Sequence, residues 1–109
     1  MSEVIRDTPF PFPDDRFPPE LGAVVQRTVV SGELPVLIVI HDEENDWVIG
    51  DGITDASDPT SIISHVRHVV ELDPTVEETA SLPCGYAAYR SSRFAPWVIE
   101  SWSYPGENS

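Results

Sequence analysis

Side chains that can do acid, metal or thiol chemistry gather in three places along the sequence. The first is an acidic run that contains His41, Asp42, Glu43, Glu44, Asp46 and Asp51. Carboxylate oxygens at this density suit a hard cation such as Ca²⁺. The EF-hand spacing is not met, because the run lacks a glycine at the sixth position of such a loop and a glutamate at the twelfth. We therefore interpret the run as a solvated hairpin turn without a metal.

The second and third places are a histidine pair and a single cysteine. On a helix, His65 and His68 would share one face, and Cys84 or His41 would have to supply a third zinc ligand through folding. No spacing signature supports this, so surface or half-buried histidines are the preferred interpretation. Cys84 stands between Pro83 and Gly85, where turn chemistry explains its neighbours. A nucleophilic thiol would need a base such as His65 or His68. We predict no catalytic residue, no metal and no cofactor.

The aromatic residues divide into core and interface candidates. Trp47 and Trp97 stand beside strand-like segments and are expected in the core. Trp102 and Tyr104, near the end of the sequence, are better candidates for contact with a partner. Large aromatic side chains often carry much of the binding energy of an interface.

The charge balance favours a basic partner. The sequence holds 19 acidic residues against 6 basic ones, a formal net charge of -13, and every basic residue is arginine. Such a surface repels nucleic acid and anionic membranes and speeds the encounter with a basic protein. A salt-adapted or GC-rich host would give the same composition without any binding role, and we leave that alternative open.

The length of 109 residues and the 40% hydrophobic content predict one soluble domain with a packed core. The longest apolar run, residues 36–40, is too short to span a membrane. The first residues lack the pattern of a signal peptide. A single cysteine excludes an internal disulfide, and a reducing, cytoplasmic location is expected. The oligomeric state is left open.

Residues 1–20 form an arm rich in proline and phenylalanine. Its five prolines disfavour helix and central strand. Phe10, Phe12 and Phe17 are costly to leave in water. We expect the rings to pack on the domain's own flank; the alternative is an arm that binds a partner.

Residues 21–102 are predicted to fold as one α+β domain, followed by a loose tail over residues 103–109. Alternation and turn residues predict a strand, or a strand running into a turn, over 23–30. They also predict a hairpin of strands 36–40 and 47–49, and a second hairpin of 86–90 and 96–100. Apolar periodicity predicts a helix over about 60–70, whose first residues could instead form a strand. A Thr75–Glu78 capping box predicts a short helix over 76–82. The fold class is a small, mostly antiparallel sheet of two hairpins, with one or two short helices on one face.

Several short motifs recur in this order in a group of small, mostly uncharacterised bacterial proteins. They are residues 29–32, 35–37, 41–47, Gly50, 71–74, 82–90 and 96–98. The chain resembles that group. It is also distantly similar to a domain of unknown function grouped with polymorphic-toxin immunity proteins. The resemblance implies an α+β fold and an immunity-type binding role, and it implies no catalytic residues.

These observations predict a binding protein that is not an enzyme. An acidic face would cover a basic site on a toxin or other protein by steric occlusion. The predicted contact surface comprises Asp42, Glu43, Glu44, Asp46, Asp51, Trp102 and Tyr104. The alternatives are a nucleic-acid mimic, a small metal-binding protein or enzyme that uses the histidines or Cys84, and a housekeeping domain whose acidity reflects its host.

Overall fold

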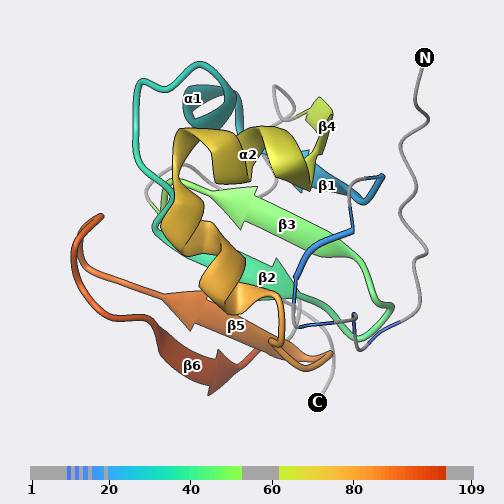
Figure 1. The fold of residues 1–109 in the computed structure, drawn as a ribbon. Helices are drawn as coiled ribbons and strands as arrows, with labels where there is room; N and C mark the ends of the chain where they lie inside the picture. The colour runs from blue at the N-terminus through green and yellow to red at the C-terminus, as the bar shows by residue number, and fades with distance from the viewer. Residues whose placement is uncertain are drawn as a thin grey trace.

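The computed structural model describes Phe10, Phe12, Asp14 and residues 16–18, 20–52 and 62–102. These residues form a six-stranded sheet in the order β4-β1-β3-β2-β5-β6, and helical elements cross one of its faces (Figure 1). The strands are β1 Gly22–Val25, β2 Ile38–His41, β3 Trp47–Gly50, β4 Ile62–His65, β5 Tyr86–Tyr89 and β6 Val98–Ser101. The helical elements are α1 Arg27–Val30, α2 Val66–Leu72 and the 3₁₀ helix η2 Pro74–Thr79.

The α+β class and both predicted hairpins are confirmed. β2 pairs with β3 and β5 pairs with β6, each in antiparallel register. The sheet is nevertheless more than two hairpins. β2 and β5 join the hairpins side by side, and β1 lies parallel to β3 while pairing antiparallel with β4. The sheet is therefore mixed.

Of the two alternatives for residues 23–30, a continuous strand is wrong and a strand that runs into a turn is close to the structure, because β1 ends at Val25 and the single turn of α1 begins at Arg27. Gln26 fixes this change of direction. Its backbone N–H donates to the Ile49 carbonyl at 3.1 Å, and its side-chain oxygen accepts from the Asp51 N–H at 2.8 Å. One helical turn then buries Val29, so tertiary packing overrides the β propensity of these residues. Gly50 permits the close approach, since a Cβ there would lie 2.7 Å from Gln26 Oε1.

The helices are shorter than predicted. In the segment expected to be a helix over about 60–70, the alternative of a strand in its first residues is confirmed, because Ile62–His65 is a strand and α2 begins only at Val66. The short helix predicted over 76–82 is η2, and Asp73 rather than a Thr75–Glu78 box caps it by accepting from the Thr75 N–H at 3.1 Å. Among the described residues, no helix combines the length and apolar character needed to cross a membrane.

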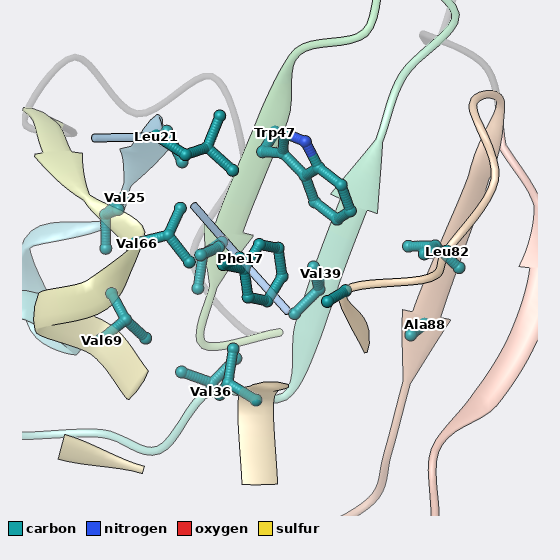
Figure 2. Packing of buried hydrophobic residues seen from close by; sticks show 14 of the residues in the cluster. Phe17, Leu21, Val25, Val36, Val39, Trp47, Val66, Val69, Leu82 and Ala88 are labelled. Atoms are coloured by element: carbon teal, nitrogen blue, oxygen red, sulfur yellow. The ribbon is translucent and has the colours of Figure 1, made fainter. Parts of the chain in front are cut away.

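The core lies between the helical elements and the sheet, and the proline- and phenylalanine-rich segment contributes to it. The expected packing of its rings on the domain is confirmed. Phe12 and Phe17 are 4% and 3% exposed, and Phe10 packs against the same cluster. Figure 2 shows the Phe17 ring in the middle of the cluster, near Trp47. The centroids of these two rings are 5.0 Å apart. Phe10, Phe12 and Phe17 thus pack in the same core as residues of the 21–102 domain.

Candidate functional site

The acidic run forms the tight turn between β2 and β3, and Asp42 holds that turn together. Its Oδ1 accepts from the backbone N–H groups of Glu44 and Asp46, each at 2.9 Å, and the residue is 1% exposed. Asn45 takes a φ of 69°, a left-handed conformation that asparagine tolerates. Asp42 therefore shapes the turn from inside, while Glu43 and Glu44 are exposed and Asp46 is half-buried.

Asp51 lies at the other end of β3 and is fully buried. Its Oδ2 accepts from the Thr28 hydroxyl at 2.6 Å, and its N–H donates to Gln26. The carboxylate thus joins β3 to α1. The acidic surface predicted between Asp42 and Asp51 is reduced to the turn itself, with Glu43 and Glu44 as its exposed carboxylates.

The fold brings Trp102 to the same end of the sheet as the acidic turn. Trp102 donates its backbone N–H to the Gly85 carbonyl at 2.9 Å and is half-buried. Gly85 lies against Glu43, because a Cβ placed on it would be 3.4 Å from Glu43 Cγ. Tyr104 and the rest of the predicted loose tail lie outside the described residues. Glu43, Glu44 and Trp102 therefore gather from two hairpins distant in sequence.

Behind the turn, His41 connects three segments of chain. Its Nδ1 donates to the Leu82 carbonyl at 2.6 Å, and its Nε2 lies 2.7 Å from Asn45 Oδ1. Cys84 Sγ is 3.4 Å from the same Nε2. The imidazole is 0% exposed and stacks on Trp47 at 3.9 Å between ring centroids. Sequence spacing gave no sign of this contact between His41 and Cys84, which are 43 residues apart.

The Cys84 thiol is poorly suited to act as a nucleophile. Although the residue is exposed, its sulfur is partly desolvated, and this desolvation together with the Asp42 charge raises the pKa of the thiol. The thiolate is the reactive form of cysteine, so the thiol stays largely protonated and unreactive at neutral pH. The contacts of His41 with Leu82 and Cys84 therefore serve better as a link between β2 and the 82–85 turn than as a catalytic dyad.

This interpretation predicts the pH dependence of Cys84 alkylation. The reaction with iodoacetamide, followed by mass spectrometry, should be slow at neutral pH. The pH at which it reaches half its maximal rate should lie above the ordinary thiol pKa of about 8.5. The Asp42→Asn variant keeps an oxygen acceptor for the turn but removes the charge, so its midpoint should fall. A midpoint at or below neutral pH in the unchanged protein would instead reveal a thiolate and favour nucleophilic chemistry.

The histidine pair is not assembled as one helical face. His65 is the last residue of β4, and His68 lies exposed on α2. Within the part of the chain that the structure describes, no three His, Cys, Asp or Glu side chains form a group suited to a metal.

A pocket of about 300 Å³ opens between α1, α2 and the segment before β2. Its walls are mainly apolar, and its polar side chains have partners in the chain. Glu33 accepts from Ser31, Asp73 binds Arg90, and Arg93 donates to the Leu72 carbonyl. Ligand pockets usually combine apolar walls with a few convergent polar groups. The polar groups here serve the fold, so we do not take this pocket as the functional site.

The second hairpin carries the three most exposed large apolar side chains of the described residues, Phe94, Val98 and Ile99, a feature that sequence patterning missed. Val98 and Ile99 of β6 are 53% and 56% exposed, and Tyr86 of β5 is 40% exposed. Phe94, in the connecting loop, is 91% exposed. Exposed apolar side chains grouped on one element often mark an interaction surface. The apolar residues at 98 and 99 gave a signal for a strand but not for its position at the sheet edge.

The candidate site is thus the end and outer edge of the sheet formed by the β2–β3 turn and the β5–β6 hairpin. It combines the exposed carboxylates of the turn with exposed apolar side chains on β6. Comparison with protein-family models, with curated proteins and with solved structures finds no match to this chain.

Proposed function

We propose that this chain is a binding protein whose acidic sheet end covers a basic surface on another protein, in the manner of an immunity-like inhibitor. The observation that carries the proposal is that two exposed carboxylates, Glu43 and Glu44, and the exposed apolar side chains of β6 belong to the same end and edge of the sheet. Interfaces that are both steered and stable combine charge at the rim with apolar contact at the centre. This surface has both components within two adjoining hairpins.

The mechanism we propose is steric occlusion aided by long-range attraction. A net charge of -13 raises the rate of encounter with a basic partner, and salt screens this effect. Once docked, the apolar side chains of β6 and the ring of Trp102 would exclude water from the contact. The partner's basic site would then be closed to its own substrate.

The competing functions receive less support. A nucleic-acid mimic needs carboxylates spaced along the surface like phosphates, but Asp42, Asp51 and Asp73 are buried and hydrogen-bonded within the fold. A thiol enzyme needs an activated cysteine, and the pKa of Cys84 is raised. These two observations favour binding over mimicry and catalysis.

The proposal can be tested by capture with matched baits from a lysate of the source organism. The unchanged protein should retain a basic protein that elutes as salt is raised. The Glu43→Gln/Glu44→Gln bait should retain several-fold less of it. The Glu71→Gln/Glu78→Gln bait loses the same charge from exposed positions on α2 and η2, and it should behave like the unchanged protein.

The captured protein is then purified and its association rate is measured by stopped-flow fluorescence. The rate should fall about tenfold or more from low to physiological salt. Equal recovery on all three baits would contradict the assignment of the turn. A rate that does not change with salt would contradict electrostatic steering.

A further inference from the structure

β6 forms one edge of the sheet, and its backbone phase can be read from a single hydrogen bond. Trp102 donates to the Gly85 carbonyl, and the register of β5 with β6 continues this pair along the hairpin. Hydrogen-bonded and non-hydrogen-bonded pairs alternate in an antiparallel ladder. Val98 and Glu100 therefore direct their backbone groups toward β5, whereas Ile99 and Ser101 direct theirs outward. No other described strand pairs with that outer edge.

Among the described residues, no proline, bulge or covering strand shields this edge, and its protection is limited to its short length of four residues and one charge. Sheet edges are commonly shielded by proline, bulges, inward-pointing charges or a covering segment. β6 contains no proline, its register with β5 runs without a bulge, and all four of its residues are exposed. The one charged side chain on the strand is Glu100.

In the antiparallel register that uses both outward-facing residues of β6, the position of Glu100 selects against a second copy of this chain. Pairing Ile99 with Ser101 of another β6 uses both outward-facing residues, and it places Glu100 directly opposite its own counterpart. Like charges opposite each other destabilise a strand pair, and this pair would be of the closer, non-hydrogen-bonded type. Two chains of net charge -13 also repel at long range. A basic residue opposite Glu100 turns the same contact into an attraction.

We infer that β6 accepts an extended, basic segment of the partner as a seventh strand, with Lys or Arg opposite Glu100 and an apolar side chain beside Ile99. This inference rests on the proposed function and specifies its mode of contact. The backbone of Ile99 and Ser101 supplies affinity without regard to sequence, and Glu100 supplies the preference for a cation. The exposed Val98 and Ile99 side chains gain apolar contact on the two faces of the extended sheet.

The experiment titrates ¹⁵N-labelled protein with two synthetic peptides and follows the backbone amides by NMR. The first is acetyl-Lys-Thr-Val-Lys-Val-Thr-Lys-amide, and the second replaces the central Lys with Glu. The first peptide should shift the Ile99 and Ser101 amides and slow their hydrogen exchange. It should bind about fivefold more tightly than the second. A version N-methylated at every residue, which can donate a backbone hydrogen bond to β6 from neither edge, should not bind.

The Glu100→Lys variant provides the matched control, because the exposed side chain can change sign without altering the ladder. It should reduce or remove the preference for the first peptide, because the local attraction at position 100 is lost while the net negative charge of the chain remains. The inference is overturned if neither peptide binds, if binding leaves Ile99 and Ser101 unperturbed, or if Glu100→Lys leaves the preference unchanged. Capture of a partner that depends on Glu43 and Glu44, together with any of these results, would preserve the proposed function and reject strand addition.

Discussion

Replacing Arg90 with leucine should lower the free energy of unfolding by about 3 to 5 kcal/mol, the usual cost of breaking a buried ion pair. The Arg90 side chain is 1% exposed and binds Asp73 at 2.6 Å. It also donates to the Val36 carbonyl and the Thr75 hydroxyl, each at 2.9 Å, and lies 4.1 Å from the Trp97 ring centroid. One guanidinium thus joins the end of β5 to the start of η2 and to the segment before β2.

The main cost comes from Asp73, which keeps its buried carboxylate when the cation is removed. Burial by itself would raise the pKa of Asp73, but hydrogen bonds from Thr75 and Arg90 outweigh it and hold the pKa below its usual value. Urea unfolding at neutral pH measures the loss. Arg93→Leu is the matched control, because Arg93 is half exposed and lies 3.8 Å from the same carboxylate. Its cost should stay within about 1 kcal/mol. A loss for Arg90→Leu as small as that expected for Arg93→Leu would show that the buried network contributes little to the stability of the fold.

Replacing Phe17 with alanine should cost about 3 to 5 kcal/mol, as expected for a large aromatic ring removed from a packed core. Phe17 is 3% exposed and packs edge-on against Trp47. Its backbone N–H donates to Glu77 Oε2 at 2.7 Å, which fixes the segment against η2. The measurement is again urea unfolding monitored by tryptophan fluorescence.

Phe94→Ala removes the same side chain from a site that is 91% exposed, and it should change stability by no more than about 0.5 kcal/mol. Phe17→Leu, with a smaller expected loss, keeps the comparison measurable if the alanine variant does not fold. If Phe17→Ala is tolerated as well as Phe94→Ala, the proline- and phenylalanine-rich segment is dispensable for the core.

Local sequence patterns predicted the two hairpins because residues close together in the sequence determine each turn and its two strands. The turn from Asp42 to Asp46 is held by hydrogen bonds that span no more than four residues. The parallel pairing of β1 with β3 joins Val24 to Val48, and no short-range pattern encodes it. For the same reason, the β-branched residues after Gln26 left a continuous strand and a strand running into a turn as alternatives, and packing produces a helical turn.

The candidate site was predictable only in part. Glu43 and Glu44 are exposed, as expected of an acidic turn, but burial of Asp51 depends on Thr28, 23 residues earlier. The approach of Trp102 to the turn likewise depends on Gly85 and the pairing of two hairpins. Composition reports how many carboxylates the chain has, whereas the fold decides which of them face water.

The contact between Phe17 and Glu77 has a consequence for folding during synthesis on the ribosome. The two residues are 60 positions apart, so synthesis at about 5 to 20 residues per second separates them by roughly 3 to 12 s. Trp47, the other main partner of the Phe17 ring, is also made after it. During this interval the nascent chain carries uncovered aromatic rings ahead of the surface that will receive them. The proline- and phenylalanine-rich segment, which completes the core of the folded protein, is therefore a segment that a chaperone would protect during synthesis.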